Sequence, residues 1–374
     1  MIDFTAELGV LGAQLELDLS AAGGPRTPLV TVPLDQWRDA PPELTARAAG
    51  LVAAALPVTV GVLAGPPAPS LEPLVSAASL TLAARTGPWA GPGGPSVIGI
   101  EDLPGAPDLE GAVERLLAAV RHSPRAAIAC GQLLRQTAGL DTAAGLAAEA
   151  AVYSMLLGGQ EFARWLAERA ERTERAAGAG RRRPPDAEPV LARRDGGRLT
   201  IELNDPARRN AFSARMREAL LDALLVAAAD ESVTSVELRG AGPSFCAGGD
   251  LDEFGTARDL VAAWLVRLSR APWRVIDRMA QKVTVFAHGA CVGAGIEMAA
   301  YASTVVAAPG AFFELPEVRM GLVPGAGGSV SVPRRVGRQR AAWLMLTGDR
   351  LPAATALRWG LVDEIRGDEI RGDE

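Results

Sequence analysis

Residues 190–364 alternate short strand-like segments with longer segments of helical periodicity, and this alternation limits the possible folds more than any other feature. "LTIELN" at 199–204 alternates apolar and polar residues, as a half-buried strand does. Apolar residues recur at helical spacing in 214–230, and a second strand segment, 233–240, ends in glycine. Another strand is expected at 282–289. Strands that alternate with helices predict an α/β fold.

A segment rich in Gly, Ala, Arg and Pro separates this region from the first half of the chain. Residues 173–189, "TERAAGAGRRRPPDAEP", lack apolar periodicity, so we expect a linker there. The linker divides the 374 residues into halves of similar size, and this length suits about two domains. The final residues, 365–374, contain "IRGDE" twice and are expected to form an acidic, disordered tail.

The first half is predicted to repeat part of the second half and then to become helical. Residues 43–65 place a helix, a "VTV" strand and a glycine in the order that is also found at 214–240. Residues 76–85 loosely resemble 300–309. Helical spacing continues in three further segments, 109–124, 125–137 and 142–174.

Composition and charge exclude several classes of protein. The chain is 48% hydrophobic and 22% charged, which suits a globular protein with a sizeable core. Its net charge of −6 argues against nucleic acid or an anionic membrane as a partner. Three cysteines and two histidines form no recognisable cluster, so we expect no metal site, no disulfide framework and no Ser-His-Asp triad. The acidic N-terminus is unlike a signal peptide, and the most apolar run, 51–65, is too short to span a bilayer, so a cytoplasmic location is expected.

Three segments between 242 and 329 combine small residues with carboxylates. "GPSFCAGGDLDEF" at 242–254 has glycines that let the backbone approach a ligand closely. "ACVGAGIEMAA" at 290–300 places small residues at a predicted helix start, where N–H groups are free, and Glu297 follows within about a turn. "FFELPEVRMGLVPGAGGS" at 312–329 carries Glu314 and Glu317 among apolar residues, which would raise the pKa of a carboxyl group.

Each segment alone has a simpler explanation: a turn, an acid in a first helical turn, or a charged loop. Together they supply two backbone N–H donors and two carboxylates. The donors can stabilise negative charge on a carbonyl oxygen, and the carboxylates can move protons at the adjacent carbons. The combination therefore indicates chemistry beside a thioester carbonyl.

Five stretches of the second half resemble the crotonase (enoyl-CoA hydratase/isomerase) superfamily in their order and spacing. They are "NDPARRNAFSARM" (204–216), "SFCAGGDLDEF" (244–254), "HGACVGAGIEMAAYAS" (288–303), "FFELPEVRMGLVPGAGGS" (312–329) and "LTGDRLPAATALRWGLVDE" (346–364). For residues 190–364 the resemblance implies a crotonase-type spiral of ββα units and an acyl-CoA thioester substrate. It also implies a homo-oligomer, a trimer or a hexamer.

The resemblance assigns roles to four residues. The two oxyanion-hole positions fall on Gly249 and Ala294, whose backbone N–H groups would polarise the thioester carbonyl. The two acid positions of the hydratases fall on Glu297 and Glu317, and the presence of both favours hydration. Glu297 would activate the water that attacks Cβ, and Glu317 would deliver a proton to Cα. Glu314 lies outside the matched acid position, and no cofactor is expected because CoA is part of the substrate.

CoA contacts are expected from two of the matched stretches. Arg208 and Arg209 lie in a stretch that runs along the CoA in the family, so their side chains are expected to meet its phosphates. Ala247, in the second stretch, is the third expected CoA-binding residue. Cys246 and Cys291 flank the motifs and are expected to be small packing residues rather than nucleophiles.

The chain also departs from the family pattern. A typical member continues after "GLVDE" with two or three helices that cover the acyl pocket and build the trimer, whereas this sequence ends soon afterwards. Residues 108–174 resemble those helices, and residues 1–172 resemble a degenerate crotonase domain that kept the opening β-α-β unit and the closing helices. We therefore hypothesise that the helices of the first half replace the missing ones at the Glu297/Glu317 pocket, within the chain or in a neighbouring protomer.

An enoyl-CoA hydratase-like hydro-lyase is the leading interpretation of the sequence. The same groups would serve an enoyl-CoA isomerase, a thioester hydrolase, a decarboxylase or a cofactor-free dioxygenase of the superfamily. A non-catalytic acyl-CoA-binding or scaffold protein is a further alternative, and the intact acid positions argue against it. Pocket walls are expected in 254–279, where Trp264 and Trp273 are either lining residues or ordinary core residues.

Overall fold

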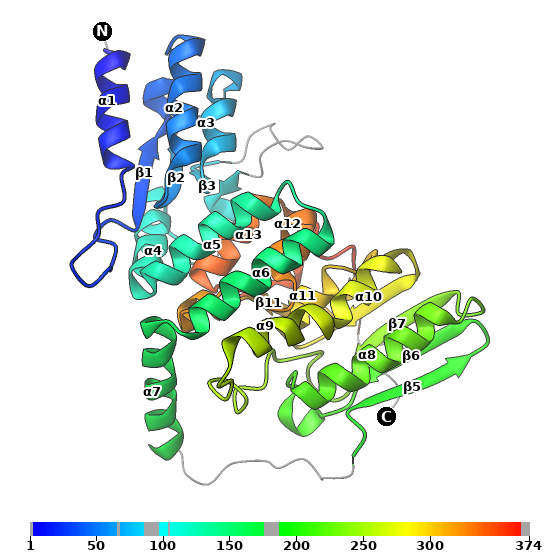
Figure 1. Cartoon of the computed structure of the whole chain (residues 1–374). Helices are drawn as coiled ribbons and strands as arrows, with labels where there is room; N and C mark the ends of the chain where they lie inside the picture. The colour runs from blue at the N-terminus through cyan, green and yellow to red at the C-terminus, as the bar shows by residue number, and fades with distance from the viewer. Residues whose placement is uncertain (1–2, 66–67, 86–96, 104, 176–186, 368–374) are drawn as a thin grey trace.

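The computed structural model describes residues 3–65, 68–85, 97–103, 105–175 and 187–367 (Figure 1). The first half begins with alternating helices and strands and continues with four helices. Its elements are α1 (Phe4–Gln14), β1 (Leu29–Pro33), α2 (Pro42–Ala54), β2 (Val58–Leu63), α3 (Glu72–Ala77), β3 (Leu80–Ala83), β4 (Ile98–Gly99), α4 (Leu109–His122), α5 (Pro124–Thr137), α6 (Thr142–Leu157) and α7 (Gln160–Arg175).

The second half alternates strands and helices throughout. Its elements are β5 (Val190–Asp195), β6 (Arg198–Leu203), α8 (Ala214–Ala229), β7 (Ser235–Gly240), α9 (Leu260–Ser269), α10 (Pro272–Arg278), β8 (Val283–Ala287), β9 (Ala290–Val292), α11 (Ala294–Ala299), β10 (Thr304–Ala307), β11 (Phe312–Glu314), the 3₁₀ helix η6 (Glu317–Met320), α12 (Gly328–Val336), α13 (Arg338–Thr347), β12 (Leu351–Pro352), α14 (Ala353–Trp359) and β13 (Glu364–Ile365).

The second half forms the predicted spiral of ββα units. Its large sheet has the order β13-β10-β8-β7-β6-β5, and only the β5–β6 pair is antiparallel. β8 leads into β9 and α11, and β10 leads into β11, η6 and α12, so two successive units each place a second strand in a small sheet of order β12-β11-β9. Cys246 extends this pattern to the preceding unit, because its backbone forms an isolated parallel β-bridge with that of Cys291 in β9.

Helices of the first half share a hydrophobic core with the second half. Leu133 of α5 and Leu146 of α6 are buried in the same cluster as Leu322 and Met345 of the second half. In Figure 1, α5 and α6 lie against α12 and α13, and these helices are in contact. The parallel sheet β1-β2-β3-β4 has a separate cluster on its outer side, around the fully buried Trp37. The two halves are therefore packed together through the helices that follow the first sheet.

Most of the expected helix and strand positions are confirmed, with two corrections. The helical segment 142–174 is interrupted at Gly158 and Gly159, so that α6 and α7 are separate helices. Ile365, which was expected to open the disordered tail, instead lies in β13 and pairs with Ala307 of β10. Residues 176–186 of the expected linker and 368–374 of the tail lie outside the described residues. Within the described part of the chain, no helix combines the length and the apolar character needed to cross a membrane.

Candidate active site

A cavity of about 280 Å³ lies where three segments of the second half meet α6. The backbone or side chains of Gly249, Ala294, Glu297 and Glu317 all line it, so the structure brings together the four residues predicted to carry the chemistry. Its apolar wall consists of Leu157, Phe212, Phe254, Val266 and Trp273, among others. Trp273 is thus a lining residue, whereas Trp264 is not among the lining side chains.

The N–H groups of Gly249 and Ala294 are available to donate hydrogen bonds to a ligand. Hydrogen bonds from Phe212 N–H to Gly248 O (2.7 Å) and from Asp250 N–H to Phe212 O (3.2 Å) hold the loop on either side of Gly249. Ala294 is the first residue of α11, where a backbone N–H has no partner within the helix. Among the described residues, neither of these two N–H groups donates a hydrogen bond to the protein. Both can therefore donate to an oxygen atom in the cavity.

Two glycines allow the acidic side chains to lie against the backbone. Gly293, which precedes α11, has φ +49, and a Cβ atom there would lie 2.6 Å from Oε1 of Glu317. A Cβ atom on Gly328 would lie 2.8 Å from Oε2 of Glu297. A side chain at either position would displace one of the two carboxyl groups.

Glu297 is buried in α11 and is held by the loop that precedes α12. Its Oε2 accepts hydrogen bonds from Ala326 N–H (2.7 Å) and from Gly328 N–H (2.8 Å). Burial raises the pKa of Glu297 well above its ordinary value, and repulsion by the carboxylates of Glu317 and Glu149 adds to the shift. The two N–H donors oppose this shift because they stabilise the ionised form.

Glu317 is buried at the start of η6, and few hydrogen bonds offset the cost of burying its carboxyl group. Its Oε2 has no hydrogen-bond partner among the described residues. Burial raises the pKa of Glu317 to about 8, and the nearby Glu149 and Glu314 contribute in the same direction. Such a carboxyl group carries a proton at neutral pH and can donate it.

Glu149 of α6 is a third buried acid at this site, and it was not among the residues predicted to form the site. It accepts hydrogen bonds from Gly327 N–H (2.7 Å), Ser329 N–H (2.9 Å) and Ser329 Oγ–H (2.7 Å). Burial raises the pKa of Glu149 to about 7, against the opposing effect of these donors and of Arg267. A signal was available, because Glu149 is the only charged residue in α6.

We expect the protein to lose stability as pH rises towards 8. Glu317 keeps its proton up to about pH 8 when folded, compared with an ordinary pKa of 4.5. The folded state therefore binds more protons within this window, so the free energy of unfolding falls as pH rises, by up to about 1.4 kcal/mol per pH unit per proton. Urea unfolding at several pH values should show this slope, and Glu317→Gln should make it shallower. Glu161→Gln is the control, because Glu161 is also buried but does not line the cavity. An unchanged slope in Glu317→Gln would contradict the assignment.

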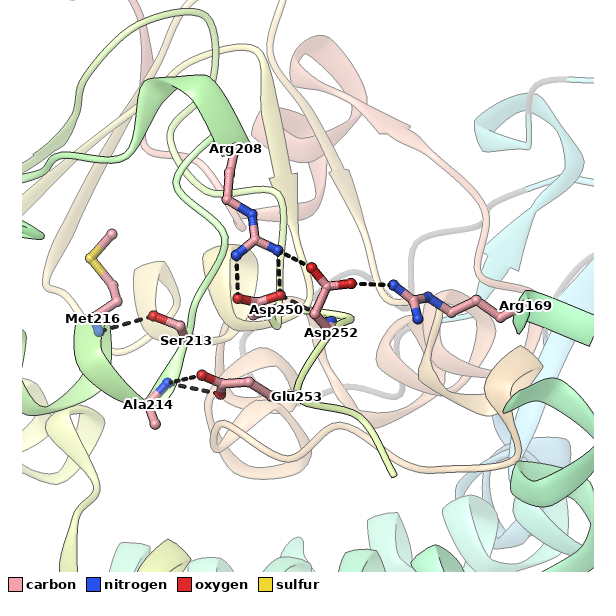
Figure 2. A network of polar contacts seen from close by, with 8 residues as sticks. All are labelled: Arg169, Arg208, Ser213, Ala214, Met216, Asp250, Asp252 and Glu253. Atoms are coloured by element: carbon pink, nitrogen blue, oxygen red, sulfur yellow. Dashed lines mark hydrogen bonds and ion pairs between the residues drawn. The ribbon is translucent and has the colours of Figure 1, made fainter. Parts of the chain in front are cut away.

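Arg208 forms ion pairs with aspartates beside the cavity (Figure 2), and its expected contact with CoA phosphates stays a prediction. Its two terminal nitrogens donate to Asp250 (2.7 and 2.6 Å), and one of them also donates to Asp252 (2.8 Å). Arg169 of α7 reaches the same Asp252 at 2.7 Å. Two carboxylates thus neutralise Arg208, and a CoA phosphate would have to compete with them.

Arg209 and Ala247, the other residues expected to contact CoA, do not line the cavity, and their contact with CoA stays a prediction. Arg209 is exposed, and its backbone carbonyl accepts a hydrogen bond from Ala247 N–H (2.9 Å), so these two residues fix the loop rather than line the cavity. Glu314 forms an ion pair with Arg350 (3.1 Å) and lies outside the cavity. Burial raises the pKa of the Cys246 thiol to about 12, which supports its packing role; Cys291 is buried likewise.

Comparison with known proteins identifies relatives of the second half of the chain. The family model of enoyl-CoA hydratase/isomerase matches residues 193–370. The 1,2-epoxyphenylacetyl-CoA isomerase of Escherichia coli (strain K12) is 34% identical over 189 residues, which cover 49% of this chain and 72% of that protein. The chain belongs to the enoyl-CoA hydratase/isomerase family. The 2,3-dehydroadipyl-CoA hydratase of the same strain is 35% identical over 167 residues, 45% of this chain and 65% of that protein. A crystal structure of enoyl-CoA hydratase from Mycobacterium smegmatis has 33% identity, covers 48% of this chain and 70% of that chain, and gives a TM-score of 0.45.

In this member of the enoyl-CoA hydratase/isomerase family, a helix of the first half forms part of the cavity wall. Tyr153 and Leu157 of α6 line the cavity, and α7 contacts η6. Within residues 108–174, α6 therefore lies at the Glu297/Glu317 pocket of the same chain, and the replacement of the family's closing helices by this segment stays a prediction. The family model begins at residue 193, so the hypothesis that the first half is a degenerate crotonase domain stays a prediction.

Proposed function

We propose that this protein is an enoyl-CoA hydratase-like hydro-lyase, which adds water to the Cα–Cβ double bond of an acyl-CoA thioester or removes it. The observation that carries the proposal is the convergence on one cavity of two unpaired backbone N–H groups and two buried glutamates. Relatives named as a hydratase and an isomerase of CoA esters support this class of substrate.

The N–H groups of Gly249 and Ala294 would bind the thioester oxygen. Addition of water at Cβ places negative charge on this oxygen in an enolate-like intermediate. Two donors that are already in place stabilise that charge without reorganisation, which is the largest single contribution in many enzymes.

The two glutamates have different surroundings, which suit different steps. Both donors on Glu297 meet Oε2, so its Oε1 is left to accept a proton from water. Glu317 holds a proton at neutral pH, because burial raises its pKa to about 8, and would transfer it to Cα. In the dehydration direction the same two groups exchange these roles.

The direct test is a panel of enoyl-CoA substrates. Crotonyl-CoA and longer or aromatic 2-enoyl-CoAs are incubated with purified protein, and loss of the absorbance of the conjugated thioester is followed. Turnover supports the proposal. Binding of these thioesters without turnover would favour a different chemistry or a scaffold role.

Glu297→Gln should separate the water step from the Cα proton step. Without the carboxylate that activates water, hydration should fall by about 10²- to 10⁴-fold. Exchange of the Cα proton of a saturated acyl-CoA with deuterated water should persist, because it needs only Glu317 and the oxyanion donors. Mass spectrometry of the recovered thioester measures this exchange. Equal loss of both activities would contradict the division of roles.

A further inference from the structure

The segment Gly325–Ser329 lies between two buried glutamates that come from different halves of the chain. Consecutive N–H groups donate alternately to the two sides. Ala326 and Gly328 donate to Glu297, at 2.7 and 2.8 Å, whereas Gly327 and Ser329 donate to Glu149, at 2.7 and 2.9 Å. Each glutamate thus holds the peptide groups that neighbour those held by the other glutamate.

We infer that Glu149 is a positioning residue for Glu297. By holding Gly327 and Ser329, it aims the N–H groups of Ala326 and Gly328 at Oε2 of Glu297, and its own charge biases whether Glu297 is ionised. The inference rests on the proposed function where it concerns turnover, because Glu297 is the proposed base. The contacts themselves are independent of that function.

The burial of this arrangement makes Glu149 hard to replace. Ala326, Gly327, Gly328 and Ser329 are each buried or nearly so, and unpaired backbone N–H groups there would be costly. Carboxylates are strong acceptors for such groups because the hydrogen bonds are charge-assisted. Glutamine has a single acceptor oxygen in the same position, so it cannot satisfy the three donors that Glu149 now binds.

The charge of Glu149 acts on Glu297 together with other groups that face it. Arg267 of α9 donates to Gly325 O (3.1 Å) and lies 3.6 Å from the ring centre of Tyr153, and its positive charge favours the ionised form of Glu149. The other titratable groups that interact with Glu149 or Glu297 include Glu317, Tyr153, Tyr301, Cys130 and Cys246. Because like charges repel, an ionised Glu149 opposes ionisation of Glu297. Removing that charge should let Glu297 ionise at a lower pH.

The first experiment compares the pH profiles of turnover in Glu149 variants. In Glu149→Gln, kcat should fall by about tenfold to a hundredfold because the loop is misplaced. KM should change little, and the limb of the profile that reports Glu297 should move to lower pH. Glu149→Asp keeps the charge but shortens the reach, so kcat should fall while the limb stays near its wild-type position.

Glu161→Gln is the matched control. Glu161 of α7 is also a buried glutamate that accepts two backbone hydrogen bonds, from Arg125 N–H (2.9 Å) and Ala126 N–H (3.0 Å), but it does not line the cavity. Its replacement should cost stability and leave the pH profile in place. If Glu161→Gln moves the profile as much as Glu149→Gln does, the effect is general loosening and the inference is wrong.

A second readout needs no turnover. The infrared absorption of protonated carboxyl groups is measured against pH in the ligand-free protein, and the signal lost in Glu297→Gln is assigned to Glu297. In Glu149→Gln this signal should titrate at lower pH. Absence of this shift overturns the inference even if enoyl-CoA turns over, whereas a shift in a protein that hydrates no enoyl-CoA supports the inference and refutes the proposed function.

Ser329→Ala is the substitute variant if the Glu149→Gln protein does not fold. This variant removes only the Oγ–H donor, which lies 2.7 Å from Glu149 Oε2, and leaves every backbone group in place. With one donor fewer, Glu149 ionises less readily, so the Glu297 signal should move in the same direction by a smaller amount. An unmoved Glu297 signal in this folded variant would contradict the role of Glu149.

Discussion

Glu317→Gln is expected to lower the turnover of enoyl-CoA by about 10²- to 10⁴-fold, the range typical for loss of a general acid. Glutamine has nearly the shape of glutamic acid but has no transferable carboxyl proton at neutral pH. Glu317 is the group that burial keeps protonated, with its pKa raised to about 8. Since Oε2 of Glu317 has no partner among the described residues, the replacement breaks no protein hydrogen bond at that atom.

The measurement is steady-state kinetics together with binding of a saturated acyl-CoA. Binding should stay near the wild-type value, because the N–H groups proposed to bind the thioester oxygen are unchanged. The alkaline limb of the wild-type profile near pH 8 should also disappear in the residual activity. Glu314→Gln is the control, because Glu314 lies three residues earlier and pairs with Arg350 outside the cavity. Turnover that survives Glu317→Gln within a fewfold would exclude Glu317 as the acid.

The sequence was most informative where backbone geometry and residue type agree. Gly293 and Gly328 show why: the carboxyl groups of Glu317 and Glu297 occupy the space that a Cβ atom would fill. Residue type alone marked these segments, by their small residues and acids, although each contact joins two different segments: Gly293 meets Glu317, and Gly328 meets Glu297. The ββα spiral was predictable for the same reason, because strand and helix periodicities alternate along a single stretch of chain.

The sequence was less informative where a contact joins distant segments. The ion pairs of Arg208 with Asp250 and Asp252 were not predicted, because their proximity depends on how two loops pack. Glu149 was missed because its partners, Gly327 and Ser329, lie in the other half of the chain. Periodicity can mark a lone charge in an apolar helix, but it cannot identify the buried donors that this charge meets.

Two helices of the first half, α6 and α7, contribute to the structure of the candidate site. In this chain, α6 supplies both a cavity wall, through Tyr153 and Leu157, and an acceptor for the loop that holds Glu297. α7 adds a second connection, because Arg169 pairs with Asp252 near the loop of Gly249. The first half therefore supports the cavity both near Glu297 and near Gly249. Changes in these helices should affect catalysis as well as stability.

Ala294→Pro is expected to lower kcat/KM by about 10²- to 10³-fold through loss of one oxyanion donor. Proline is tolerated at the first position of a helix, where its missing N–H would have no helical partner. Ala294 occupies that position in α11, and the preceding residue, Gly293, has no Cβ to clash with the proline ring. The variant should therefore keep its fold, which circular dichroism and thermal unfolding can check.

Ala294→Val separates the lost donor from added bulk. Valine has as many side-chain carbon atoms as proline but retains the N–H group, so it should keep most of the activity that Ala294→Pro loses. The proline variant should also bind an enolate-like inhibitor more weakly than the valine variant does. The negatively charged oxygen of such an inhibitor would accept strong hydrogen bonds from the N–H groups of Ala294 and Gly249. If proline and valine lower kcat/KM equally, steric exclusion explains the loss. The Ala294 N–H would then have no part in stabilising the intermediate.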